Sequence, residues 1–166
     1  MSASDATDAP PQSEPALRAI AMPADANPAG DIFGGWLLSQ MDLAGSTVAT
    51  RRAKGRVVTV AITAMTFHRP VFVGDEVSCY GEMIRTGRTS MTVRVEAWRR
   101  HLPSDEVRKV TEAIFTYVAI GESRRPRRLP PAVAPAAGSI CPRVHWPGAL
   151  SGCQRKKGCR GGAVRR

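Results

Sequence analysis

The sequence predicts an α+β fold in which a curved antiparallel sheet wraps around one long central helix. Two observations predict it: one helical pattern is followed by four strand-like runs, and the connections between these runs are short. Short connections favour antiparallel neighbours, because parallel strands need a long crossover. The chain of 166 residues, 43% of them hydrophobic, has the length and composition of one domain with a substantial core.

The helix is expected over about residues 35–52, preceded by an edge strand over 17–22 and a loop over 24–31. Its apolar and small positions recur at steps of three and four residues: Leu38, Met41, Ala44, Gly45 and Val48. Ala44 and Gly45 would let another element approach the helix backbone closely. Gly55 suits the end of the helix, where basic residues favour the helix dipole.

Four strands are expected after the helix. Residues 57–67 are β-branched with little polar interruption, as expected of a strand covered on both faces. Residues 76–85 form a second run, residues 89–100 alternate between apolar and polar positions, and residues 107–120 make the last strand. The alternation places one group on one face (Met91, Val93, Val95 and Ala97) and a second group on the other (Thr92, Arg94, Glu96 and Trp98).

Composition divides the chain into a leader over residues 1–15, a domain over 16–122 and a basic tail over 123–166. The net charge is +10, but residues 1–120 hold 13 Lys/Arg and 13 Asp/Glu, whereas residues 121–166 hold 11 Lys/Arg and one acid. The excess of basic residues therefore lies in the tail and not in the domain, and nucleic acid is not expected as a main partner. Leader and tail lack an apolar period and are expected to be disordered.

Neither a membrane span nor a metal site is expected. No run reaches the roughly 18 apolar residues of a span. The first residues lack the features of a secretory signal, so a cytoplasmic location is expected. Cys79 is expected to be a buried small hydrophobe. The tail offers a possible zinc set, but its spacing matches no standard ligand pattern. That set is Cys141, His145, Cys153 and Cys159.

Residues 30–42 place three glycines before the helix and one carboxylate within it. Gly35 and Asp42 lie seven residues apart, nearly two turns, so they share one helix face. The start of a helix offers free N–H groups and the positive end of the dipole. These features suit a site that polarises a carbonyl and attacks it or activates water. They also suit a helix packed through glycine, with Asp42 exposed or capped by a neighbour.

Residues 17–121 resemble the hotdog-fold acyl-CoA thioesterases, most closely the YciA-type bacterial branch. The resemblance rests on five motifs in the family's order. They are MPADANPAGDIFGGW at 22–36, SQMD at 39–42, GRVVTV at 55–60, PVFVGD at 70–75 and GRTS at 87–90. The fold that this family implies, a curved antiparallel sheet around a central helix, is the one that the residue patterns predict.

The resemblance implies hydrolysis of acyl-CoA to a free acid and CoA, without a metal or cofactor. Asp42 matches the family's catalytic carboxylate, Asn27 matches a loop asparagine near the reacting centre, and Gly34 and Gly35 match the helix-start amides that polarise the thioester carbonyl. Family members form dimers or trimers of dimers with sites between subunits. The acid and the amides can therefore serve one thioester from opposite chains.

The phosphates of CoA call for basic and hydroxyl side chains along its path. The candidates lie in loops or at strand ends of the matching motifs: Arg56, Arg69, Arg88, Thr89 and Ser90. His68 departs from the residues expected there and suggests a histidine base, although no acid lies beside it in sequence. Ser46, one turn beyond Asp42, either orients that carboxylate or packs, and packing is favoured.

Two other functions stay open. One is a non-catalytic hotdog module that binds acyl-CoA, against which Asp42 and Asn27 together argue. The other gives the function to the basic tail, as an arm for nucleic acid or an acidic surface. The sequence decides neither the acyl-chain preference nor whether Asp42 acts as general base or nucleophile.

Overall fold

A computed structural model describes residues 9–131 of the chain. The predictions for residues 1–8 and 132–166, including the disorder expected there and the tail's possible zinc set, lie outside the described residues.

The described residues form one long helix and five strands, in the predicted order. The helix is α1 (Gly34–Ala53), and a short 3-10 helix, η1 (Pro23–Asp25), lies in the loop before it. The strands are β1 (Leu17–Ile20), β2 (Val57–Phe67), β3 (Glu76–Thr86), β4 (Ser90–His101) and β5 (Glu106–Ala119). The bounds agree with the predicted ones to within one or two residues.

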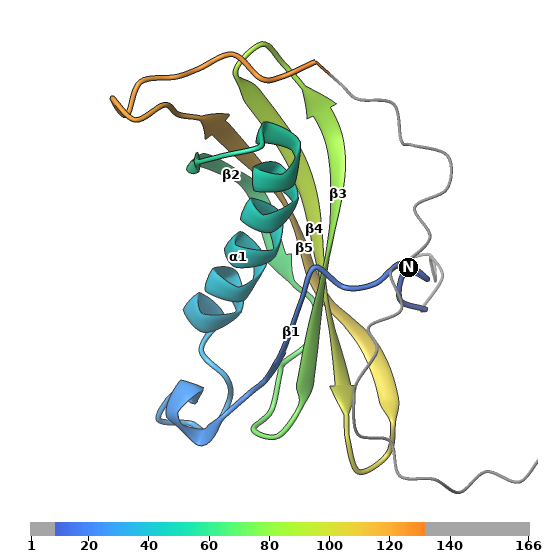
Figure 1. Cartoon of the computed structure of the whole chain (residues 1–166). Helices are drawn as coiled ribbons and strands as arrows, with labels where there is room; N and C mark the ends of the chain where they lie inside the picture. The colour runs from blue at the N-terminus through green and yellow to red at the C-terminus, as the bar shows by residue number, and fades with distance from the viewer. Residues whose placement is uncertain (1–8, 132–166) are drawn as a thin grey trace, which may run out of the picture. The chain divides into compact units, whose positions relative to one another are not determined.

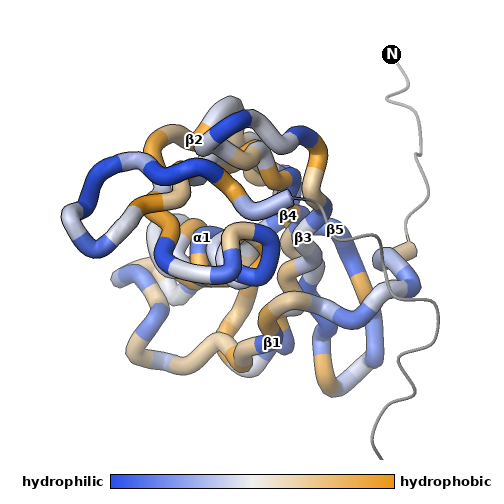
Figure 2. Tube along the Cα trace, turned by 45° about the horizontal axis from the view of Figure 1, so that its top comes forward, coloured by the Kyte–Doolittle hydropathy of each residue, from blue (hydrophilic) through white to orange (hydrophobic). Residues whose placement is uncertain are grey.

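All five strands join one antiparallel sheet in the order β1-β3-β4-β5-β2. The sheet curls around α1, which lies along its concave face (Figure 1). Figure 2, which looks more nearly down the helix, shows the strands arranged around α1. The predicted fold class is confirmed.

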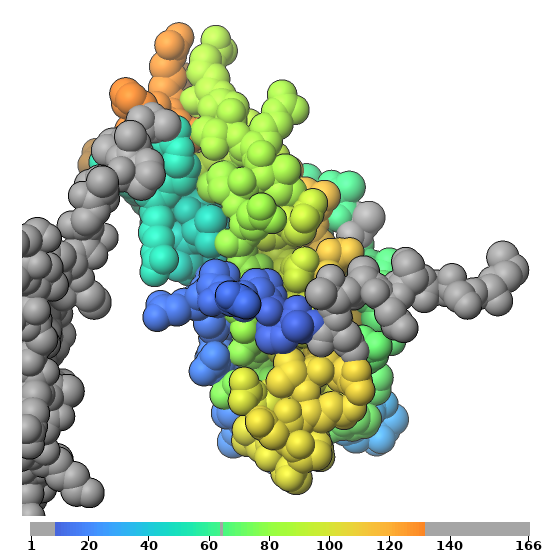
Figure 3. All heavy atoms as spheres, turned by 90° about the vertical axis from the view of Figure 1, so that its right-hand side faces the viewer, coloured from blue at the N-terminus to red at the C-terminus, as the bar shows by residue number. Residues whose placement is uncertain are grey.

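The core lies between α1 and the concave face of the sheet. The predicted inward positions of β4 are all fully buried there, and so is Cys79, whose thiol pKa burial raises to about 12. Trp98 is also almost fully buried, although it faces outward as predicted. It lines a small hollow on the outer face together with Pro10, and Figure 3 shows the N-terminal segment crossing that face.

The prediction that residues 57–67 are covered on both faces is wrong for the single chain. This segment, β2, is an edge strand, and Val58, Val60 and Ile62 are 39%, 55% and 41% exposed. A continuous β-branched run is typical of strands buried on both faces, but strand order is not encoded in that run. The outer edge of β2 thus presents unpaired backbone groups flanked by apolar side chains.

Residues 123–131 pack against the domain, beyond the boundary expected at residue 122. The guanidinium of Arg127 donates to the carbonyl of Ala53, at the end of α1, over 2.6 Å. Leu129 packs on the core, and its N–H donates to the carbonyl of Arg88. This segment therefore ties the end of α1 to the β3–β4 turn.

Candidate active site

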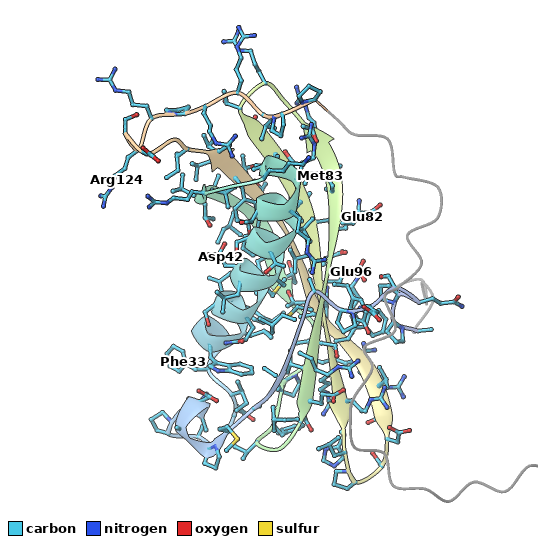
Figure 4. All side chains as sticks on the ribbon, in the orientation of Figure 1. Phe33, Asp42, Glu82, Met83, Glu96 and Arg124 are labelled. Carbon is cyan, nitrogen blue, oxygen red and sulfur yellow. The ribbon has the colours of Figure 1, made fainter. Side chains whose placement is uncertain are left out.

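Asp42 lies on the middle of α1, with Phe33 at the helix start and Arg124 beyond the opposite end (Figure 4). Its carboxylate oxygen Oδ1 accepts hydrogen bonds from two hydroxyls, Thr59 of β2 at 2.8 Å and Tyr117 of β5 at 3.0 Å. Within residues 9–131 the other oxygen, Oδ2, accepts none. Asp42 is thus a half-buried carboxylate with one oxygen fixed and one available.

The helix start carries the predicted amides. Phe33 is extended, with φ −64° and ψ 127°, and Gly34 and Gly35 are the first two residues of the helix. Their N–H groups precede the first intrahelical donors and are free to bind an acceptor. Gly34 lines a pocket of about 340 Å³ between the helix start and the end of β2. This pocket is a suitable entrance to those amides.

Asn27 shapes the loop that leads into the helix. Its side-chain oxygen accepts hydrogen bonds from the N–H groups of Ala29 at 2.8 Å and Asp31 at 3.2 Å. Its N–H donates to the Asp31 carbonyl over 2.7 Å. The side-chain amide nitrogen has no acceptor among the described residues, which leaves it as a donor at the same end of the domain as Gly34.

Most of the predicted CoA-binding residues gather at the other end of the helix. Arg88 and Thr89 precede β4, Ser90 begins it, and Arg56 precedes β2. Backbone hydrogen bonds join Thr89 to Ala119 and Arg56 to Ile120, so these residues flank the end of β5 on both sides. Neighbouring strands lie about 4.8 Å apart, which puts the two sides about 10 Å from each other.

Arg69 does not belong to this basic group. It lines the pocket at the helix start, and its guanidinium donates to the Lys109 carbonyl over 3.1 Å. His68 lines the same pocket. Glu112 is within electrostatic reach of His68, but a hydrogen bond from Lys109 is the main cause that lowers the pKa of Glu112. Glu112 is therefore already paired with a lysine.

Asp42 and the glycine amides share one helix, but they lie too far apart along it for the site that their common helix face suggested. Seven or eight residues of helix correspond to about 10–12 Å along its axis. Asp42 does not line the pocket that Gly34 lines. One chain places Asn27 in the loop before the helix-start glycines, at the same end of the domain, and holds Asp42 further along the helix.

Sequence reasoning missed Thr59 and Tyr117. Both occupy inward-facing positions of strands, and Tyr117 is fully buried there, where a polar side chain needs a partner, whereas Thr59 is exposed. That signal could have marked Tyr117, but only the register of β2 and β5 brings both residues to Asp42. Ser46 does not orient Asp42, because its hydroxyl donates to the Leu43 carbonyl over 2.9 Å.

Two features are absent from residues 9–131. No helix there is long and apolar enough to cross a membrane. No group of three or more His, Cys, Asp or Glu residues there could hold a metal ion.

The fold is that of the hotdog thioesterases, as comparison with solved structures shows. The hexameric thioesterase y2039 of Yersinia pestis superposes with a TM-score of 0.70 at 51% identity, covering 74% of this chain and 99% of that one. HI0827, a hexameric broad-specificity acyl-coenzyme A thioesterase, has a TM-score of 0.70 at 45% identity, covering 74% and 84%.

Sequence comparison gives the family. The model of the thioesterase superfamily matches residues 29–103. The acyl-CoA thioester hydrolase YciA of Salmonella typhimurium is 50% identical over 126 residues, which span 74% of this chain and 95% of that protein. YciA of Escherichia coli K12 is 50% identical over 123 residues, spanning 72% and 93%. The chain belongs to the thioesterase superfamily, in the branch of the YciA acyl-CoA thioester hydrolases.

Proposed function

We propose that the protein hydrolyses acyl-CoA to a free carboxylic acid and CoA without a metal, with Asp42 assisting the attack on the thioester. The observation that carries this proposal is the Asp42 carboxylate, half-buried on α1 with Oδ1 bound to two hydroxyls. The 50% sequence identity between this chain and proteins named acyl-CoA thioester hydrolases supports the substrate class.

In the favoured mechanism Asp42 is a general base. Its Oδ2 takes a proton from water while the water oxygen bonds to the thioester carbon. The carbon–sulfur bond then breaks, and the proton held by Asp42 passes to the departing CoA thiolate. In the alternative, Asp42 attacks the carbon and forms an anhydride that water opens. Single-turnover hydrolysis in ¹⁸O water separates the two, because only the anhydride route can transfer an Asp42 oxygen to the product.

The carbonyl oxygen gains negative charge during attack, and the amides of Gly34 and Gly35 are suited to bind it. Removal of one such donor lowers kcat by about 10²–10³ in other enzymes. The side-chain NH₂ group of Asn27, at the same end of the domain, is the candidate for holding the thioester or the water beside these amides.

The acid and the amides of one site come from different subunits in this proposal. A carbonyl bound to an amide and attacked by water held on a carboxylate places the two protein groups about 7 Å apart. The 10–12 Å spacing within one helix is longer than this. The exposed apolar edge of β2 suits a second copy, and antiparallel pairing there reverses the partner's direction, so its helix start can approach Asp42. Hexameric relatives support dimers assembled into a trimer of dimers.

The phosphates of CoA are assigned to the basic end of the domain, at Arg88, Thr89, Ser90 and Arg56. Arg69 lies at the opposite end of its own chain, so in a dimer it would serve the partner's site. Removal of Arg88 is expected to weaken acyl-CoA binding more than removal of Arg69, whose guanidinium already binds the Lys109 carbonyl.

A thiol-release assay over several acyl-CoA chain lengths tests the proposal. Asp42→Ala and Asp42→Asn are expected to lose turnover, whereas Asp105→Asn, in an exposed turn with φ +54° that suits asparagine, should match the wild type. Equal rates for the wild type and both Asp42 variants would refute the mechanism. Binding of acyl-CoA without turnover by the wild type would favour the non-catalytic module.

A further inference from the structure

Tyr117 connects the sheet to the proposed base. It lies on β5, is fully buried, and points its hydroxyl at α1. The hydroxyl oxygen is 3.0 Å from Asp42 Oδ1 and 3.1 Å from the main-chain carbonyl oxygen of Asp42. One phenol therefore contacts both the side chain and the backbone of the same helical residue.

The packing around Tyr117 fixes the position of this hydroxyl. A Cβ added at Gly45 would collide with the hydroxyl oxygen and come within 3.1 Å of Val95. The ring also stacks on Phe115, with centroids 6.1 Å apart and planes 13° apart. The missing side chain at Gly45 is thus what admits the phenol to Asp42, as the small residues of the helix predicted.

The phenol is held as a hydrogen-bond donor. Burial raises the pKa of Tyr117, and the neighbouring Asp42 carboxylate raises it further, to well above the usual range. Tyr117 therefore keeps its proton at neutral pH. A donor to a carboxylate favours its ionised form, which is the form that a general base needs.

We propose that Tyr117 is a positioning residue of the hydrolysis, which fixes Asp42 Oδ1 from the sheet and leaves Oδ2 to accept the proton of water. This inference rests on the proposed function of Asp42. Thr59 binds the same oxygen from β2, at 2.8 Å. The difference is that Thr59 is exposed on the edge strand, whereas Tyr117 is fixed by the core.

Tyr117→Phe tests the proposal, because it removes the hydroxyl and keeps the stacked ring. The expected result is a fall in kcat of about tenfold with little change in KM. The acid limb of the kcat/KM profile should move up by about one pH unit, because a carboxylate that loses a donor is protonated more easily. A merely structural tyrosine would lower the Tm and leave that limb in place.

The chain has two tyrosines, which allows a second test that keeps the hydroxyl. Tyr80 lines hollows on the outer face of the sheet, one of them with Glu82 and Glu96. Tyr80→Phe is therefore the matched control and is expected to keep the wild-type profile. When the Tyr80→Phe chain is produced with 3-fluorotyrosine in place of tyrosine, the analogue enters at Tyr117 alone. Its more acidic phenol is a stronger donor, so the acid limb should move to lower pH, opposite to Tyr117→Phe.

The outcomes separate the two proposals. Wild-type turnover in Asp42→Asn would overturn the proposed role of Asp42, on which the role of Tyr117 rests. If Asp42→Asn is inactive but neither change at Tyr117 moves the acid limb, the positioning role is wrong and the proposed function stands. A change confined to KM would overturn the positioning role in the same way.

Discussion

The proposed division of one site between two subunits predicts complementation between two inactive chains. Asp42→Ala removes the acid. Gly34→Pro removes one amide N–H at the first helical position, where proline is tolerated and where the extended Phe33 before it suits a proline. Gly34→Ala is the control, since it adds the same Cβ, 3.2 Å from the far end of the Phe67 ring, and keeps the N–H.

The magnitude follows from the proposal that the two groups come from different chains, which rests on their 10–12 Å spacing along one helix. In a two-fold dimer of the two variants, one site combines both defects and the other has neither. Random pairing makes about half of the dimers mixed, so coexpression of both chains should restore about a quarter of wild-type activity. A site within one chain would give no intact site and no recovery.

Coexpression of wild type with the double variant gives the reciprocal measurement. A mixed dimer then has one defect in each site, so about a quarter of the activity remains, against about half for sites within one chain. Thiol release from acyl-CoA, with the subunit ratio measured by mass spectrometry, checks both numbers. No recovery in the first mixture together with half activity in the second would refute the intersubunit site.

Three further predictions follow from other parts of the structure. Asp75 is fully buried and bound by Arg99 at 3.1 Å, His101 at 2.8 Å and the Phe72 N–H at 3.0 Å. Burial raises the pKa of Asp75, but these hydrogen bonds outweigh it and hold the pKa below its usual value. The stability that Asp75 contributes is therefore present above about pH 4 and lost as the pH falls through the lower folded-state pKa. Asp75→Asn should lower the free energy of unfolding by about 3 kcal/mol near pH 7 and make it depend less on pH in the acid range. Thermal melts from pH 3 to 7 measure both effects, and an unchanged Tm would contradict the prediction. In the thiol-release assay, Arg88→Ala should raise KM about tenfold with kcat nearly unchanged, and this rise in KM should exceed the one caused by Arg69→Ala. A fall in kcat alone would argue against a contact between Arg88 and a phosphate. Truncation after residue 131 should leave activity and Tm unchanged. Truncation after residue 122 should lower the Tm, because it removes Leu129 and the Arg127 bond to Ala53. A loss of activity on truncation after residue 131 would give the tail a role.

The sequence by itself determined the helix, the strands and the residues worth testing. Local periodicity decides whether a segment such as 89–100 forms a strand, and the motifs around residues 27–42 identify Asn27, Gly34, Gly35 and Asp42 as candidates. Both kinds of information lie within a few neighbouring residues, so they can be read without knowing how the chain folds back on itself.

Only the tertiary structure decided which residues meet. Strand order makes β2 an edge, and strand register brings Thr59 and Tyr117 to the same oxygen of Asp42. The same register places Arg88 and Arg56 at one end of the domain, and Arg69 lines the pocket at the other end. A one-residue change of register turns every side chain of a strand to the opposite face. Contacts between segments that are 17 and 75 residues apart therefore follow from the assembled sheet, and no local pattern contains them.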